Sequence, residues 1–204
     1  MKKFVSIFKN KEIVSRIFFT IMILFIIRIG AAIAVPGAKP TAGLESALNS
    51  GNAIALMDLL GGGALSNFSI FALGVSPYIT AQIIVELLSK DVLPALTELS
   101  KQGEYGRKKK EMATRYLTLL LGAVQAYGII KTMENGANGE GYITVNNPSF
   151  WTYAYIVLIM LAGAMTVMWL GDQITDKGLG NGISMVIFAG IVRSLPIKIS
   201  SAFQ

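Results

Sequence analysis

The chain has 204 residues, of which 53% are hydrophobic and 15% are charged. It contains no cysteine and no histidine, which excludes disulfides and the usual zinc sites and removes the commonest general base. The net charge of +6 would suggest a nucleic-acid partner for a soluble domain, but here the charges cluster between long apolar runs, as in membrane proteins.

Five apolar runs, each close to the length needed to cross a bilayer, predict an all-α polytopic membrane protein. The predicted spans are residues 17–35, 68–88, 116–131, 151–170 and 183–200. The segments between them are an N-terminal segment 1–16, an outer loop 36–67, a basic loop 89–115, an outer loop 132–150 and a short loop 171–182.

The N-terminus has two interpretations. Its lysines, the apolar run and the small residues near Ala32 resemble a cleaved signal peptide. Arg28 interrupts the apolar region and further spans follow, so a retained first span is preferred. Lysine and arginine are concentrated in segments 1–16 and 89–115, which places the N-terminus in the cytoplasm and the end of the fifth span outside.

Three consecutive glycines, Gly61, Gly62 and Gly63, interrupt the chain before the second span. The apolar piece before them, residues 53–60, would reach only ~12 Å as a helix, under half of a ~30 Å hydrocarbon core. Irregular backbone at membrane depth is tolerated only where it is buried in protein or lines a watery cavity. The break therefore predicts a water-accessible path and leaves both a channel and a transporter open.

Charged residues within the spans have a functional and a structural interpretation. Glu86, near the cytoplasmic end of the second span, is a functional candidate by position, but contact with the cytoplasmic vestibule or a loop lysine is the preferred explanation. Arg193 lies three residues before Pro196 and can extend outward, whereas Arg28 is deeper. Neither arginine can be given a partner from the sequence.

The glycine-rich run at 178–182 resembles a nucleotide-binding loop, but no strand precedes it and no Lys-Ser or Lys-Thr follows it. A tight turn into the fifth span, with Asn181 or Ser184 as the N-cap, is preferred.

A compact basic patch lies in the loop 89–115. It comprises Arg107, Lys108, Lys109 and Lys110. Two explanations stay open. The patch is either a topology signal that also attracts lipid headgroups, or a contact for an RNA-rich or acidic partner.

Two pairs of aliphatic residues have helical spacing: Val75 with Ile79 in the second span, and Ile187 with Ile191 in the fifth. Residues four apart share a helix face, and a ring of such residues can close a pore to ions by dewetting. Helix packing or lipid contact is the commoner explanation, so spacing alone does not assign a gate.

Four stretches of the chain resemble the bacterial SecY family of protein-translocation channels. GGGALSNFSIFALGVSPYITAQII is similar to that family's plug and second span, and RIGAAIAVPG to the end of its first span. KQGEYGRKKKEMATRY resembles its loop between spans two and three, and MWLGDQITDKGLGNGISMVIFAGIVRSLP its segment from span four through span five. The matches follow in order over nearly the whole chain.

The resemblance implies the fold and the activity. It implies one five-span half of a ten-span inverted-repeat channel with a short re-entrant plug helix, in a bacterial plasma membrane. The channel would pass unfolded secretory proteins and release membrane segments into the bilayer, without enzymatic activity, cofactor or metal. The implied partners are small SecE-like and SecG-like membrane subunits, signal peptides and nascent chains, lipid, and a SecA motor or ribosome that docks mainly on the absent second half.

The resemblance also implies the functional residues. The plug would cover about 53–66 and include Leu56, Met57, Leu60, Gly61, Gly62, Gly63, Ala64, Leu65 and Ser66. The pore ring would comprise Val75, Ile79, Ile187 and Ile191. The chain departs from the family pattern in two places, with Val75 in place of a more usual isoleucine and Glu86 in place of a more usual glutamine.

A rival hypothesis is half of an inverted-repeat secondary transporter, which also uses broken helices. Such a protein would gather polar or charged side chains at the break, where the sequence offers Ser66, Asn67 and Ser69 and no convergent charge. An intramembrane enzyme is disfavoured because histidine, cysteine and a plausible carboxylate pair are missing.

Overall fold

The computed structural model describes residues 11–49, 55, 58, 61, 63–90, 103–136 and 141–202, and for 45–47, 49 and 193–202 it describes the backbone alone. The elements in chain order are α2 (Lys11–Gly30), β1 (Ala38–Pro40), α3 (Ala42–Asn49), α5 (Ser76–Leu88), α7 (Gly103–Asn135), β2 (Ile143–Val145), α8 (Phe150–Lys177) and α9 (Gly182–Ala202).

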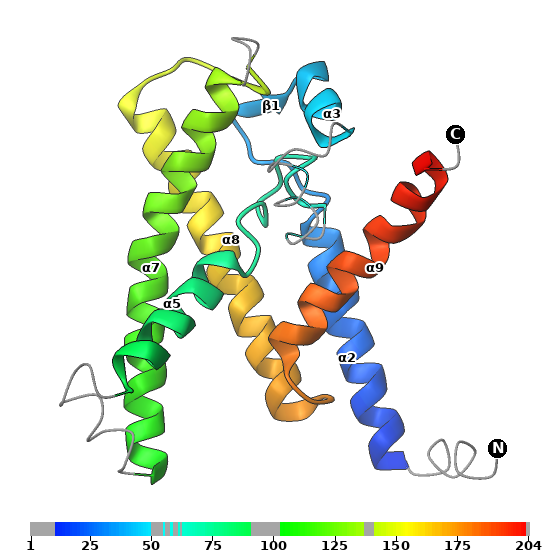
Figure 1. The fold of residues 1–204 in the computed structure, drawn as a ribbon, viewed down its shortest axis with the longest axis vertical. Coiled ribbons are helices and arrows are strands. Elements are labelled where there is room, and N and C mark those ends of the chain that lie inside the picture. The colour runs from blue at the N-terminus through cyan, green and yellow to red at the C-terminus, as the bar shows by residue number, and fades with distance from the viewer. Residues whose placement is uncertain are drawn as a thin grey trace.

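The long helices run between two ends of the molecule, and successive ones alternate in direction (Figure 1). The start of α2, the end of α5, the start of α7 and the turn from α8 to α9 lie at one end, which we call the basic end. The strands and α3 lie at the opposite end, the strand end. Helix α5 packs on α7, α7 packs on α8, and α8 also contacts α2 and α9.

Three of the described helices, α2, α7 and α8, are long and apolar enough to cross a membrane. Helix α9 begins one residue before the predicted fifth span. Helix α5 has 13 residues and would reach only ~20 Å. The five-span count and the limits of each span in the bilayer remain predictions.

Helix ends differ from the predicted spans because hydropathy marks the apolar part of a helix, while helical hydrogen bonding continues into water. Helix α7 begins at Gly103, so the second half of the predicted loop 89–115 is helical rather than loop. Helix α8 continues to Lys177, past the predicted end at 170. Helix α2 begins at Lys11 and ends at Gly30, earlier than predicted at both ends.

The prediction of one continuous helix over 68–88 is wrong. Residues 64–75, which we call the anchor segment, form successive turns, and α5 begins only at Ser76. Phe68 and Gly74 have positive φ angles of 43° and 56°, which no α-helix contains. Pro77, in the first turn of α5, lacks the N–H that a helix interior requires, so it favours a helix start here.

The anchor segment pairs with the chain that leaves α2. The Val35 N–H donates to the Phe68 carbonyl at 2.9 Å, and the Ile70 N–H donates to the Ile33 carbonyl at 3.0 Å. On the other side, the Ile70 carbonyl lies so close to Gly163 of α8 that a Cβ at that position would collide with it. The segment is therefore held between the end of α2 and the middle of α8.

The two predicted outer loops are joined by an antiparallel pair of strands, which the sequence analysis did not predict. Ala38 pairs with Val145, and Pro40 with Ile143. The Tyr142 N–H donates to the Met133 carbonyl at 2.7 Å, which ties β2 to the last turns of α7. This short sheet fixes the strand end of α7 relative to the chain after α2.

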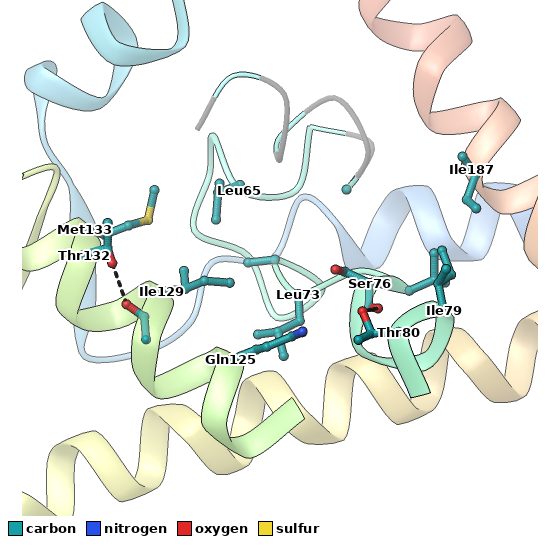
Figure 2. A pocket seen from close by; sticks show the side chains of 14 residues that line it. Leu65, Leu73, Ser76, Ile79, Thr80, Gln125, Ile129, Thr132, Met133 and Ile187 are labelled. Carbon is teal, nitrogen blue, oxygen red and sulfur yellow. Dashed lines mark hydrogen bonds between the residues drawn. The ribbon is translucent and has the colours of Figure 1, made fainter. Parts of the chain in front are cut away.

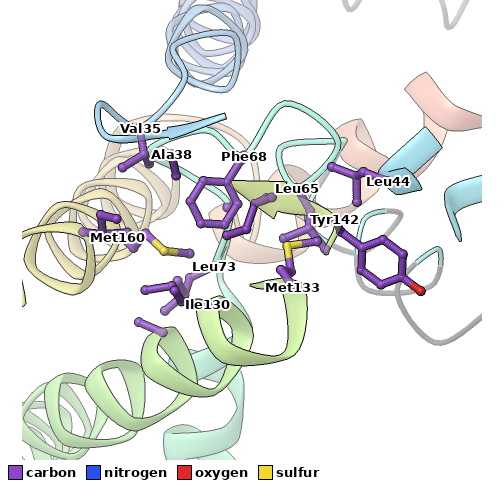
Figure 3. Close-up of a cluster of buried hydrophobic side chains, with 14 of the residues drawn as sticks. Val35, Ala38, Leu44, Leu65, Phe68, Leu73, Ile130, Met133, Tyr142 and Met160 are labelled. Atoms are coloured by element: carbon purple, nitrogen blue, oxygen red, sulfur yellow. The ribbon is translucent and has the colours of Figure 1, made fainter. Parts of the chain in front are cut away.

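The main core lies beneath this sheet and includes the anchor segment (Figure 3). Phe68, Ile130 and Met160 are fully buried where the segment, α7 and α8 meet. The other labelled members of the cluster are Val35, Ala38, Leu44, Leu65, Leu73, Met133 and Tyr142. Burial of Phe68 and Leu65 in this core stabilises a segment that has little regular secondary structure of its own.

An ion pair at the basic end and a hydrogen bond from Tyr153 at the strand end link α7 to α8. At the basic end Arg115 donates to Asp172 at 3.0 Å, yet partial burial raises the pKa of Asp172 above its usual value. At the strand end Lys131 donates to Glu134 at 2.8 Å, and the Tyr153 hydroxyl donates to the same carboxylate at 2.6 Å. These two hydrogen bonds lower the pKa of Glu134, the Lys131 bond having the larger effect.

Candidate functional site

A cavity of about 470 Å³ lies where the anchor segment, the start of α5, the strand-end half of α7 and α9 come together (Figure 2). Its wall is largely aliphatic, with a few hydroxyl and amide groups. The lining residues are Gly61, Leu65, Ala72, Leu73, Val75, Ser76, Ile79, Thr80, Gln125, Gly128, Ile129, Thr132, Met133 and Ile187. Such a wall excludes ions without providing a specific polar site.

Three of the four predicted ring residues line this cavity. Val75 is buried, while Ile79 and Ile187 are partly exposed into it from α5 and α9. The Ile79 N–H donates to the Val75 carbonyl at 3.0 Å, so the two residues are one helical turn apart as their spacing predicts, although Val75 is the N-cap of α5. Ile191 lies one turn beyond Ile187, is partly buried, and is not among the lining residues.

The described plug residues lie at the same cavity. Gly61 and Leu65 line it, Ala64 is buried, and Ser66 is partly buried. Gly63 has a φ of +74°, which glycine adopts without steric cost. The remaining predicted plug residues, Leu56, Met57, Leu60 and Gly62, lie outside the described residues.

Asp58 is a site residue that the sequence analysis missed. Its Oδ1 atom accepts the Leu65 N–H at 3.0 Å and the Ser66 N–H at 2.8 Å, and its carbonyl accepts the Gly63 N–H at 2.7 Å. The break therefore carries one carboxylate that the sequence analysis did not consider, and that carboxylate binds backbone amides. A short acidic side chain just before a glycine run was the available signal, because aspartate commonly accepts backbone N–H groups at turns.

The predicted basic patch lies far from this cavity, at the basic end. Its four residues lie within the first two turns of α7, and three of them, Arg107, Lys108 and Lys109, are exposed. Lys109 lies 4.7 Å from the centre of the Tyr105 ring, a cation–π contact within the helix. The patch is thus a helical surface rather than the predicted loop, and its partner stays a prediction.

Of the three charged span residues, the structure describes the side chains of two, and these have different surroundings. Glu86 is exposed on α5, as the vestibule interpretation expects. Arg28 is partly buried and lines a second, smaller cavity of about 50 Å³ between α2 and α9, together with Val186 and Gly190. Arg193 lies where only the backbone of α9 is described.

The glycine-rich run at 178–182 forms the predicted turn into α9, and of the two predicted N-cap candidates Asn181 is the cap. Its Oδ1 atom accepts the N–H groups of Ile183 at 3.1 Å and Ser184 at 3.2 Å. The Gly182 N–H donates to the Thr175 hydroxyl at 2.9 Å, and the Leu179 N–H donates to the Thr20 hydroxyl at 3.2 Å. Side chains therefore already bind the amides that a nucleotide phosphate would need.

Comparison with curated proteins gives relatives along nearly the whole chain. The chain is 48% identical to protein translocase subunit SecY of Streptococcus sanguinis, over 97% of this chain and 44% of that protein. It is 50% identical to protein translocase subunit SecY 1 of Lactobacillus kefiranofaciens, over 93% and 43%, and 43% identical to SecY of Staphylococcus carnosus, over 98% and 46%. The chain thus spans less than half the length of these relatives.

Two solved structures resemble the fold at low sequence identity. One is described as a protein conducting channel, with a TM-score of 0.67 and 16% identity over 91% of this chain and 38% of that chain. The other is Sec61 in a canine ribosome–channel complex, with the same TM-score, identity and coverage. The SecY family model matches residues 69–204. On this match and the identities above, the chain belongs to the SecY family.

Proposed function

We propose that this chain forms the N-terminal half of a protein-conducting channel subunit in a bacterial plasma membrane. The channel would pass unfolded secretory proteins across the membrane and release membrane segments into the bilayer. One observation carries the proposal. The same aliphatic cavity is lined by three ring residues, Val75, Ile79 and Ile187, and by two predicted plug residues, Gly61 and Leu65. We call the turn that contains the glycines at 61–63 the glycine turn. The fold of solved protein-conducting channels supports the proposal.

The chemistry of the cavity suits a passage for varied chains. A translocating polypeptide presents every kind of side chain, so its path cannot rely on a specific polar site. An aliphatic ring deforms around such a chain, whereas an ion would lose its hydration there at a cost of several kcal/mol. Val75, Ile79, Ile187 and Ile191 would supply this half of the ring.

The segment before the anchor segment would act as the plug that backs the ring at rest. In this proposal, residues from about 53 to the glycine turn move, and the glycines at 61–63 give the backbone its freedom to hinge. Leu65, although predicted to belong to the plug, is packed in the main core with Phe68 and Met133 and cannot move freely. We therefore propose that only the residues before Gly61 move.

The partners follow from the same proposal. SecE-like and SecG-like subunits would cover exposed apolar faces such as those of α2 and α7, and lipid would cover the rest. No residue in the described part suggests an energy source, so a SecA motor or a ribosome would drive translocation. Arg107, Lys108, Lys109 and Lys110, exposed or nearly so at the basic end, offer at most a secondary contact to such a partner.

The transporter hypothesis gains no support from the curated relatives or the solved structures. The carboxylate of Asp58 at the break does not support a transporter either. The Oδ1 atom of Asp58 is already bonded to two backbone amides, so it is not presented to a solute.

Ion conductance of the resting channel tests the proposed seal. Ile79→Ser and Ile187→Ser, introduced into the assembled channel in planar bilayers, should each raise the resting conductance, because a hydroxyl lets water and ions enter the constriction. Each ~1.4 kcal/mol removed from the barrier gives about a tenfold rise.

The matched control is Phe188→Ser in α9, next to Ile187 but absent from the cavity wall and 64% exposed. This variant should leave the conductance unchanged. Equal conductance of the ring variants and the control would contradict the assignment of the seal.

A further inference from the structure

The anchor segment is fixed to the body of the molecule at several points. Phe68 has no exposed surface, and Leu65 is 2% exposed in the main core. Backbone hydrogen bonds join Phe68 to Val35 and Ile70 to Ile33, and the Ile70 carbonyl rests against Gly163. Moving this segment would disrupt the core, so it has to stay in place when the chain before it moves.

Asp58 bridges the glycine turn. It precedes Gly61, and the three N–H groups that it accepts, from Gly63, Leu65 and Ser66, belong to residues that follow it. The Ser66 hydroxyl donates to the Gly63 carbonyl at 2.8 Å and closes the same turn. Gly61 also packs backbone to backbone against Gly74, with its Cα 3.3 Å from where a Gly74 Cβ would lie.

A hinge within the glycines cannot open while these bonds persist. The donors at 65 and 66 are fixed with the core, so displacing the residues before the turn separates the carboxylate from both. Hydrogen bonds to a charged acceptor contribute more than neutral ones, so separating the carboxylate from these two amides costs more than breaking two ordinary backbone hydrogen bonds.

We propose that Asp58 is a latch that holds the plug at rest by binding across the glycine turn to the amides of Leu65 and Ser66. This inference rests on the proposed function, since it takes the residues before the turn to be a displaceable plug. Asp58 is a positioning residue: it sets how often the plug leaves the constriction and does not itself line the cavity.

Labelling of a single cysteine tests the latch. The chain has no cysteine, so Ala55→Cys gives a unique thiol three residues before Asp58, at a position that is 4% exposed. In the assembled channel in proteoliposomes, a membrane-impermeant maleimide added outside should label it slowly at rest. Adding Asp58→Ala should raise that rate about tenfold or more, because two bonds to a charged acceptor are lost.

Two further variants separate the latch from general loosening. Asp58→Asn keeps an acceptor oxygen without the charge, so its rate should fall between those of the parent and of Asp58→Ala. Asp176→Ala removes an exposed carboxylate at the basic end and should change nothing. A reference thiol at Ala126, which has no exposed surface in the core, should stay unlabelled in every variant.

The outcomes distinguish the latch from the proposed function. A stalled translocating chain should expose Ala55→Cys in the parent channel whether or not Asp58 is a latch. If it does so while Asp58→Ala labels at the parent's resting rate, the latch is wrong and the channel stands. If Ala55→Cys stays protected even with the stalled chain, the residues before the turn are not a displaceable plug. The proposed role of Asp58 is then wrong as well. Should Asp58→Ala fail to assemble, a parent-like rate for Asp58→Asn overturns the latch.

Discussion

At Gly163 the backbone of α8 lies directly against the anchor segment. A Cβ there would collide with the carbonyl oxygen and carbon of Ile70, which are backbone atoms and cannot rotate away. The anchor segment in turn contributes Leu65, Ala72 and Val75 to the cavity wall. Because Gly163 has no side chain, the anchor segment can lie against α8, and this contact helps to position the constriction.

Gly163→Ala should lower the stability of the folded channel by about 1–3 kcal/mol, the usual cost of overpacking a tight contact. Gly128→Ala in α7 is the matched control, because a Cβ there meets no atom within 4 Å. In a helix interior that change should be neutral or stabilising by up to about 1 kcal/mol. Thermal unfolding of the purified complex measures both, and equal melting temperatures would contradict the close packing.

Single residues also show what the sequence could predict. The N-cap at Asn181 was predictable, because a short polar residue before an apolar run is a local signal. Asp58 was missed because its partners follow a glycine run whose path the sequence does not specify. Pro77 and Gly74 could have indicated that α5 starts late, but the unbroken apolar run over 68–88 outweighed them.

At the scale of elements, the turn from α8 to α9 decides how α9 enters the bundle. Asn181 caps α9, Thr175 of α8 binds Gly182, and Thr20 of α2 binds Leu179. Three helices are thus tied at the basic end by side chains that accept backbone N–H groups. Since α9 contributes Ile187 to the cavity, the cap also helps to position that residue.

Asn181→Ala should destabilise the channel by about 1 kcal/mol through loss of the cap. Ser184→Ala, at the other cap position considered from the sequence, should cost less, because the Ser184 backbone is bound by Asn181 and its side chain is exposed. Thermal unfolding of the two complexes compares them directly. A larger loss for Ser184→Ala than for Asn181→Ala would show that the cap is assigned to the wrong residue.

The elements show a clear limit to sequence-based prediction. Each of the five apolar runs overlaps one described helix, α2, α5, α7, α8 or α9, because hydropathy marks the apolar part of a helix. The runs could not locate the helix ends, because α7 continues back through charged residues to Gly103. The pairing of β1 with β2 depends on contacts between segments far apart in the chain, and three-residue strands have no periodic signal of their own.

For the whole molecule, the alternation of helices and the charge asymmetry support one orientation. Arg16, Lys90 and Lys177 lie at the basic end with the patch on α7, whereas the strand end carries Lys39 and Lys131. The positive-inside rule then favours a cytoplasmic basic end, with the short sheet outside. The cavity would lie at the chain's own constriction, between α5, α7 and α9.

In the proposed channel, a translocating polypeptide passes between α5 and α9. Photo-crosslinking in the assembled channel tests this path, with a photoreactive residue at Ile79 or Ile187 and a stalled translocating chain. Both positions should crosslink to the chain, and Phe188, which is exposed on α9 but does not line the cavity, should not. Crosslinking at Ile79 and Ile187 no stronger than at Phe188 would contradict this path.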